Sequence, residues 1–237
     1  MLSFLHSGAL QFGLSLTDAQ LNTFERYLQE LLAWNERVNL TGITEPAEIV
    51  TKHFLDSLSV YPALQDLPPT VSLIDVGSGA GFPGIPLKIA LPQLRVTLLE
   101  ATGKKTAFLQ HLIQSLNLTG ASVVTARAEE AGQQPQQRER YEVAIARAVA
   151  GLPVLAEYML PLVKVGGRVI VQKGQDPADE VKQAASALRI LGGKVAQVLP
   201  VTVPGLDAQR HLIVIQKIKA TPKAYPRRPG VPAKKPL

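Results

Sequence analysis

The chain has 237 residues, 46% of them hydrophobic, which is enough for one α/β domain with a small appendage and a sizeable buried core. It contains no cysteine, and this excludes disulfides, thiolate metal sites, iron–sulfur clusters and any mechanism with a thiol nucleophile. The four histidines lie far apart in the sequence with no H-x-x-x-H pair, so the sequence predicts no metal site.

The net charge of +6 is concentrated at the C-terminal end of the chain. Seven lysines and arginines and no acidic residue follow position 216, so the preceding residues carry a net charge of −1, from 18 cations and 19 anions. The segment 220–237 also contains five prolines, and we expect it to be extended and largely without helix. Such a basic, proline-rich tail suits contact with the phosphates of a polynucleotide, although its composition fits a solubilising end equally well.

The N-terminus and the apolar stretches predict a cytoplasmic protein. Residues 1–6 lack a basic region and a small-residue cleavage pattern, which argues against export. The longest apolar stretch, 143–163, contains Arg147, Glu157 and two prolines, so it does not resemble a membrane span. We therefore expect a monomer that makes no contact with a membrane.

Residues 1–69 are predicted to form an N-terminal helical cap. Thr17 to Gln20 match a capping box, and the apolar residues that follow repeat at helical spacing along one stripe. A second helix is predicted to begin at 44–46, with proline in its first turn. The asparagines, threonines and glycine of 34–44 interrupt the helical pattern, so we interpret this stretch as a shaped loop.

Several polar residues of this cap are expected to have structural roles. Asn35, Asn39 and His53 are predicted to satisfy buried backbone groups between the cap and the rest of the chain. Lys52 and Asp56 stand four residues apart, a spacing that predicts an ion pair on one face of a helix.

From about residue 70 to residue 219 the chain alternates strand-like and helix-like segments. The strands are expected at 71–76, 95–100, 122–126, 142–146 and 168–172, and the helices from about 86 and over 104–116, 153–163 and 177–191. Such alternation is typical of a doubly wound parallel sheet that binds ligands at the carboxyl ends of its strands. The last two apolar runs, 194–203 and 211–218, are separated by a short turn and predict an antiparallel closing pair, which dinucleotide-binding folds generally lack.

The most informative motif follows the first of these strands. Asp75-Val-Gly-Ser-Gly-Ala-Gly81 has glycine at alternating positions, which lets the backbone turn sharply and approach a ligand closely. The next strand ends in Glu100, at a distance typical of a carboxylate that accepts the hydroxyls of a ribose. The pattern resembles the cofactor loop of S-adenosylmethionine methyltransferases.

The same stretch also matches a dinucleotide-binding fingerprint, because residues 79–84 spell a literal G-x-G-x-x-G. In that fold the helix begins inside the glycine run and places its N-terminus under a pyrophosphate. Here Pro83 and Pro86 flank the last glycine, so the helix is predicted to begin late, near 84–87. Asp75 would repel a pyrophosphate and suits a cofactor with a positive amino-acid end. An NAD-dependent oxidoreductase is the alternative enzyme class.

The carboxyl ends of the other strands supply further candidate residues. Glu129 follows the third strand and could accept the exocyclic amine of an adenine. Arg147 ends the fourth strand, where cofactor and substrate would meet, and Lys173 ends the fifth. Each of these residues could instead form an ion pair at the surface.

The end of the fourth strand also restricts the methyl acceptor. Enzymes that methylate the exocyclic amines of bases typically present Asn or Asp followed by Pro-Pro and an aromatic residue there, and those that attack pyrimidine C5 usually need a cysteine. This chain has Ala146-Arg-Ala-Val149 and no cysteine. Guanine N7 remains as an acceptor, because its free lone pair carries no proton and needs no general base. Arginine or lysine can hold guanine O6 and phosphate.

Five motifs together resemble the glucose-inhibited division protein B family over nearly the whole chain. They lie at 34–44, 52–58, 75–86, 146–149 and 225–230. The resemblance implies a bacterial 16S ribosomal RNA guanine-N7 methyltransferase that uses S-adenosylmethionine, with N-terminal helices on a methyltransferase sheet. It also implies a substrate guanine in the decoding-region loop of the small-subunit RNA.

The site residues follow from the motifs and from this resemblance. The glycine loop predicts cofactor contacts at Asp75 and Gly79, and the resemblance implies further contacts at Gly77, Phe82, Glu100, Ala101, Thr102, Ala128, Glu129 and Arg147. Arg147 is also the candidate catalytic residue, because it would orient the cofactor and the base. The RNA-binding candidates are Lys173, Arg210, Lys223, Arg227, Arg228, Lys234 and Lys235.

Removing 220–237 is expected to weaken RNA binding and to leave cofactor affinity almost unchanged. A ribosome-assembly factor that binds RNA without catalysis is the other alternative.

Overall fold

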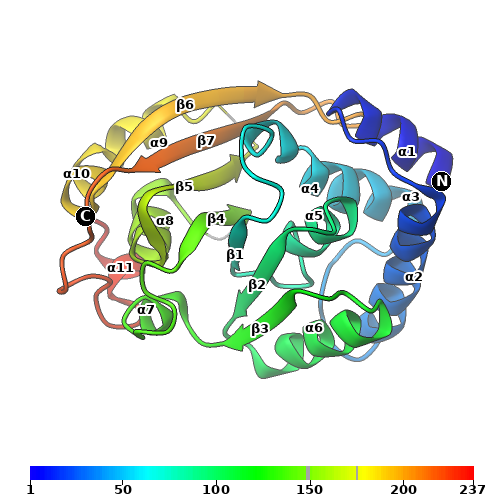
Figure 1. Ribbon diagram of the computed structural model, residues 1–237, viewed down its shortest axis with the longest axis horizontal. Helices are drawn as coiled ribbons and strands as arrows, with labels where there is room; N and C mark the ends of the chain where they lie inside the picture. Colours follow the sequence, from blue (N-terminus) through cyan, green and yellow to red (C-terminus); the bar gives the residue numbers. More distant parts are fainter. Residues whose placement is uncertain (148–149, 175) are drawn as a thin grey trace.

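A seven-stranded sheet forms the centre of the computed structural model, which describes residues 1–147, 150–174 and 176–237 (Figure 1). The strands are β1 (Ser72–Val76), β2 (Arg95–Glu100), β3 (Ala121–Thr125), β4 (Tyr141–Arg147), β5 (Val163–Lys173), β6 (Gly193–Val201) and β7 (Arg210–Lys217). Their order is β3-β2-β1-β4-β5-β7-β6, with β1 to β5 parallel and β7 antiparallel to both of its neighbours. The predicted doubly wound α/β sheet with an antiparallel final strand is confirmed.

Helices cover both faces of the sheet, which explains why the parallel strands are nearly continuous runs of apolar residues. The helices that follow β1 in the chain are α5 (Gly84–Ala90), α6 (Gly103–Ser115), α7 (Ala128–Ala131), α8 (Leu152–Met159), α9 (Ala178–Gln183) and α10 (Ala185–Leu191). Apolar side chains of α5 and α6 join one buried cluster, and those of α7, α8 and α10 join a second. Within the described residues, no helix has the length and apolar character needed to span a membrane.

The N-terminal residues form helices, as predicted, and their apolar side chains pack into the same cluster as α5 and α6. The helices are α1 (Leu2–Gln11), α2 (Asp18–Asn35), α3 (Pro46–Ile49) and α4 (Asp56–Leu58), with a π-helical turn at Val50–Leu55. The capping box is present, because the Thr17 hydroxyl accepts a hydrogen bond from the Gln20 amide and the Gln20 side chain accepts one from the Thr17 amide. The Asn35 side chain accepts hydrogen bonds from the amides of Leu40 and Thr41, which confirms its structural role.

The π-helical turn overturns the predicted ion pair between Lys52 and Asp56. Hydrogen bonds from residue i to i+5 wind the backbone between Lys52 and Asp56 more loosely than an α-helix, so these two side chains do not share one face. Lys52 pairs instead with Glu48 at 2.5 Å. The Asp56 carboxylate, which is 4% exposed, is directed toward the sheet and bonds to Arg147.

Two predicted helices differ from the structure in extent, and one helix was not predicted. The helix expected over 153–163 ends at Met159 and continues as a 3₁₀ turn, because Pro161 has no amide hydrogen to donate to the preceding turn. The helix expected over 177–191 is divided into α9 and α10 at Ala184. The helix α7 was not predicted, since four residues are too few to give a periodic pattern.

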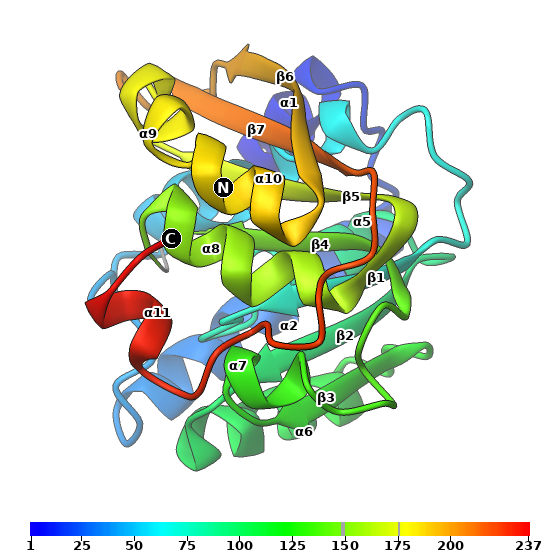
Figure 2. The same ribbon diagram turned by 90° about the vertical axis from the view of Figure 1, so that its left-hand side faces the viewer.

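The C-terminal segment 220–237 returns from the end of β7 across α8 and α7, as Figure 2 shows. It is largely without helix, as predicted, and its one helix is the short α11 (Val231–Lys234). The Arg138 guanidinium donates to the carbonyls of Thr221 and Tyr225, each at 2.7 Å. The segment is therefore fixed to the rest of the fold at Thr221, Pro226 and Pro232, which are buried, and much of the remainder is exposed.

Candidate functional site

Two cavities lie at the carboxyl edge of the parallel strands, where the topology predicts ligands to bind. The first, which we call the β1–β2 cavity, has a volume of about 270 Å³. Five of the predicted cofactor residues line it, namely Gly77, Glu100, Ala101, Ala128 and Glu129. The second, the β4–β5 cavity, has a volume of about 500 Å³ and is lined by Arg147, Lys173 and Arg210 among others.

The glycine loop forms one wall of the β1–β2 cavity because its backbone adopts conformations that other residues rarely reach. Gly77 and Gly81 have φ angles of 75° and 103°, in the left-handed region. A Cβ atom at Gly81 would lie only 2.9 Å from the Tyr27 hydroxyl. That hydroxyl donates to the Ala80 carbonyl at 2.6 Å, so α2 holds the loop from behind.

Glu100 connects the glycine loop to the end of β2. Its carboxylate accepts hydrogen bonds from the Gly79 amide at 3.0 Å and from the Thr102 amide at 2.8 Å. The side chain is nearly buried, at 8% exposure, and still forms part of the cavity wall. Because a carboxylate offers about four acceptor positions, two remain for hydroxyl groups of a ligand.

Asp75 lies differently from the prediction that it contacts the cofactor directly. It is fully buried, and its Oδ2 accepts a hydrogen bond from the Gly84 amide at 2.9 Å, at the start of α5. Burial raises the pKa of Asp75 to about 7, although the Gly84 hydrogen bond and the charge of Arg147 oppose the shift. Its position therefore indicates a role in fixing the glycine loop onto α5 from within the fold.

We expect Asp75→Asn to remove a pH dependence of stability. The folded state keeps the Asp75 proton up to a pKa of about 7, whereas the unfolded chain releases it near the ordinary value of 3.8. The stability that this group contributes is therefore lost as pH rises from about 4 to 7, by roughly 2–4 kcal/mol in the free energy of unfolding. Asparagine can still accept the Gly84 amide and does not ionise. Urea unfolding of the wild type and of Asp75→Asn at pH 4.5 and 8 measures the two free energies of unfolding. An equal change of this free energy with pH in both proteins would contradict the prediction.

The β4–β5 cavity is organised around a buried carboxylate that bonds to two arginines. Asp56 accepts from Arg147 at 2.8 Å and from Arg210 at 2.7 Å, and the two guanidinium groups retain one net positive charge between them. Arg147, the last residue of β4, also donates to the Lys52 carbonyl at 3.1 Å. Both guanidinium groups are thus fixed with part of their surface in the cavity, at 14% and 21% exposure.

His53 and Phe82 form an aromatic layer beside these arginines. The two rings stack with their centroids 4.5 Å apart, and the Arg147 guanidinium carbon lies 5.1 Å from the Phe82 centroid. Burial and the Arg147 charge lower the pKa of His53 to about 4, so the imidazole is neutral at pH 7. Phe82, a predicted cofactor contact, lies in this layer and not among the residues that line the β1–β2 cavity. His53 lines the β4–β5 cavity, which the expected backbone role did not anticipate.

The predicted RNA-binding residues fall into two groups. Three are bonded to acidic side chains: Lys173 lies 2.8 Å from Glu180, Arg210 lies 2.7 Å from Asp56, and Arg227 lies 2.5 Å from Glu157. Exposed side chains belong to Lys223, Arg228, Lys234 and Lys235. The prediction for Arg227 needs correction, because its guanidinium binds the buried Glu157 and anchors the C-terminal segment.

Two residues of the site were not identified from the sequence. Asp56 joins Arg147 to Arg210 across 91 and 154 residues of chain, and Tyr158 lines the β1–β2 cavity from α8. Asp56 lies in the motif at 52–58, but its spacing of four residues from Lys52 indicated a local ion pair and not a residue of the site. Nothing in the sequence distinguishes Tyr158 from an ordinary core residue. The predicted motif at 146–149 extends to Ala148 and Val149, which lie outside the described residues.

Comparison with known proteins identifies the family of the chain. The GidB family model, described as rRNA small subunit methyltransferase G, matches residues 20–213. The chain is 54% identical over 236 residues to the "Ribosomal RNA small subunit methyltransferase G" of Roseiflexus sp. (strain RS-1), with all of both proteins covered. It is 49% identical over 233 residues to the protein of the same name from Acetivibrio thermocellus, covering 98% of this chain and 95% of the relative.

A solved structure supports the fold independently. TrmN from Thermus thermophilus superposes with a TM-score of 0.52 at 16% identity, over 71% of this chain and 53% of that one. Identity this low supports the fold alone. The family match and the identity to relatives over nearly their whole length identify the family as well, and they confirm the resemblance that the motifs indicated. The chain belongs to the rRNA small subunit methyltransferase G family.

Proposed function

We propose that this protein transfers a methyl group from S-adenosylmethionine to N7 of a guanine in 16S ribosomal RNA. Family membership makes it a methyltransferase, and the observation that carries the finer proposal is the β4–β5 cavity. There Arg147 and Arg210 are held by one buried carboxylate, beside an imidazole that is neutral at pH 7. A guanine base with its attached phosphates offers the acceptors that such arginines bind.

The β1–β2 cavity fits S-adenosylmethionine, which supplies the methyl group when it is bound. The Glu100 carboxylate has free acceptor positions for ribose hydroxyls, and Glu129 presents a second carboxylate that suits an adenine amine. The glycine loop brings backbone to the cavity wall without side chains in between. Asp75 would hold that loop in place.

Methylation at N7 needs orientation more than proton transfer. The N7 lone pair forms the new bond to carbon, and the electrons of the broken bond stay on sulfur, so no proton leaves the base. We assign Arg147 the role of orienting the base, with Asp56 and Arg210 fixing its position. We further propose that the enzyme acts as a monomer, in the cytoplasm and without a metal.

The test is the chemistry of the product. N7-methylguanine carries a positive ring charge, so mild reduction followed by aniline cleaves the RNA at that nucleotide. We expect one new cleavage in 16S ribosomal RNA after incubation with the protein and S-adenosylmethionine. A methyl group on a ring carbon or an exocyclic amine would not permit cleavage and would refute the assignment. RNA binding without any methyl transfer would instead indicate an assembly factor.

The exposed cations of the C-terminal segment are proposed to bind RNA phosphates. Replacing Lys223, Arg228, Lys234 and Lys235 by alanine is expected to reduce the slope of log K against log salt by about 0.7–0.9 for each phosphate that the variant no longer binds. A filter-binding titration at several salt concentrations measures this slope.

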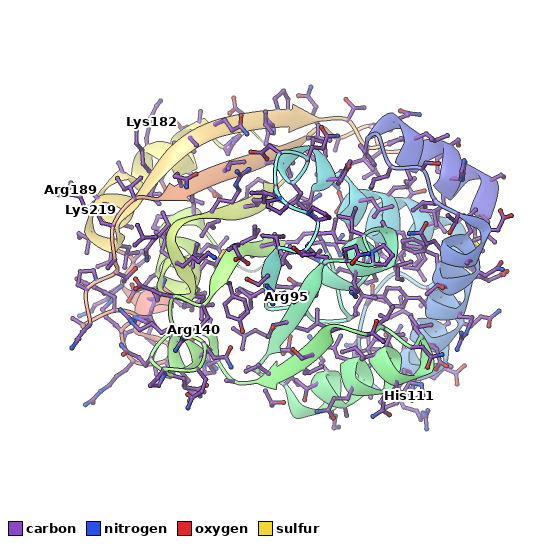
Figure 3. All side chains as sticks on the ribbon, in the orientation of Figure 1. Arg95, His111, Arg140, Lys182, Arg189 and Lys219 are labelled. Carbon is purple, nitrogen blue, oxygen red and sulfur yellow. The ribbon has the colours of Figure 1, made fainter. Side chains whose placement is uncertain are left out.

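The matched control removes cations from another surface. Lys182, Arg189 and Lys219 point outward beside α9 and α10, as Figure 3 shows. Their replacement by alanine is expected to leave the slope nearly unchanged. An equal reduction of the slope in the two variants would mean that RNA binding depends on overall charge and not on the C-terminal segment.

A further inference from the structure

The C-terminal segment contacts a residue of the β1–β2 cavity through Gly230, although no residue of the segment lines the cavity itself. The Gly230 amide donates a hydrogen bond of 2.8 Å to Oε1 of Glu129, which lines that cavity and is 3% exposed. Gly230 has a φ angle of 80°, so its backbone conformation is one that other residues rarely adopt. The second oxygen, Oε2, lies 3.7 Å from the Arg127 guanidinium. One oxygen of Glu129 is therefore held by a residue about 100 positions further along the chain.

A buried ion pair anchors this segment three residues earlier. Glu157 is fully buried in α8, and within the described part of the chain every donor that bonds to it belongs to Arg227. The Arg227 amide donates at 2.8 Å, and its guanidinium contacts both carboxylate oxygens. Glu157 precedes Tyr158, which lines the cavity. Removing Arg227 would leave a buried charge unpaired, so the anchor is strong.

Close packing at Pro226 fixes the segment against the end of α7. Gln133 donates to the Pro226 carbonyl at 2.8 Å. A Cβ atom at Gly132 would lie 2.7 Å from Cγ of Pro226, so the two stretches of chain touch with no room for a side chain. Since α7 carries Glu129, the helix and the segment are fixed to each other from both ends.

We propose that the C-terminal segment 221–237 supports the cofactor site from outside the cavity, and that Arg227 and Gly230 are positioning residues for Glu129. The Gly230 amide holds Oε1, which leaves Oε2 oriented to accept the exocyclic amine of adenine. This inference rests on the proposed function, because it assigns Glu129 to the adenine of S-adenosylmethionine. It also replaces the expectation that removal of 220–237 leaves cofactor affinity almost unchanged.

The experiment compares two ligands on the full-length protein by calorimetry. S-adenosylhomocysteine carries the 6-amino group, whereas S-inosylhomocysteine carries a 6-oxo group that a carboxylate repels. The wild-type protein is expected to prefer S-adenosylhomocysteine by roughly tenfold or more, since a hydrogen bond to a charged acceptor contributes about that factor. The ratio of the two affinities reports the position of Glu129, which a purely structural role of the segment would not alter.

Two variants displace the segment by different means. Gly132→Val places a side chain against Pro226, and Arg227→Ala combined with Glu157→Gln removes the anchor without leaving a buried charge. Both are expected to bind S-adenosylhomocysteine several-fold more weakly and to lose most of the preference. The control is Arg189→Ala, which removes the same charge from an exposed residue of α10 and should keep the wild-type ratio.

The outcomes separate the two proposals. Variants that fold, as judged by thermal melting, and keep the wild-type affinity ratio overturn the inference, as does a wild-type protein that binds both ligands equally. A wild-type protein that binds neither ligand refutes the proposed function itself. If Gly132→Val does not fold, Gly132→Ala and the double variant supply the same comparison.

Discussion

Replacing Arg147 by alanine is expected to slow single-turnover methylation about a hundredfold at saturating RNA and cofactor, because a small misplacement of reacting groups costs on that order. Arg147 is the last residue of β4. Its guanidinium is held by the Asp56 carboxylate at 2.8 Å and by contact with the Phe82 ring. Arg147 also donates to the Lys52 carbonyl at 3.1 Å, so its side chain links the end of β4 to the π-helical turn. Rapid-quench measurement with a labelled methyl group gives the rate.

Two further variants show whether charge or geometry is lost. Arg147→Lys keeps the charge but has no planar fork, so we expect it to recover little of the rate. Asp56→Asn keeps one acceptor oxygen and should lose less activity than Arg147→Ala, while Arg210 becomes less firmly held. A rate of Arg147→Ala equal to that of the wild type would reduce the residue to a structural ion pair.

Replacing Glu100 by alanine is expected to weaken binding of S-adenosylmethionine by about 1–3 kcal/mol, as is usual when a buried hydrogen-bonded group loses its charged partner. The loss combines the missing acceptor for ribose with release of the Gly79 and Thr102 amides that the carboxylate now holds. Calorimetry measures the affinity directly.

The control for this prediction removes a carboxylate elsewhere. Glu30 bonds to His111 on α6 at 2.7 Å and is not among the residues that line the β1–β2 cavity. Glu30→Ala is expected to bind the cofactor as the wild type does. If Glu100→Ala also kept its affinity, the ribose hydroxyls would have to bind elsewhere.

Local patterns predicted the parts of the fold that local chemistry determines. The glycines at 77, 79 and 81 are required by the left-handed backbone of a turn, so they are visible without the rest of the structure. The capping box at Thr17 depends on residues three apart, and it is present. The late start of α5 at Gly84 follows from the prolines around it. The closing antiparallel strand followed from the short turn between two apolar runs.

Contacts between distant segments could not be predicted in the same way. Asp56 meets Arg210 across 154 residues, and the direction of its side chain depends on a π-helical turn that no sequence pattern indicated. Glu157 looked like one polar residue in an apolar helix, and only the folded segment shows that Arg227 neutralises it. The carboxylate of Asp75 suited a cofactor contact. Its burial under the glycine loop depends on how β1 and α5 pack, which the sequence did not indicate.

The pairing of Glu157 with Arg227 also sets an order of events during translation. Glu157 is synthesised 70 residues before Arg227, an interval of roughly 4 to 14 seconds at ordinary synthesis rates. During that interval the nascent chain holds a carboxylate whose burial without a cation would cost several kcal/mol. The packing of α8 around Glu157 is therefore completed only after Arg227 has been synthesised, which makes a segment made 70 residues later a requirement for closing the core beside the cofactor cavity.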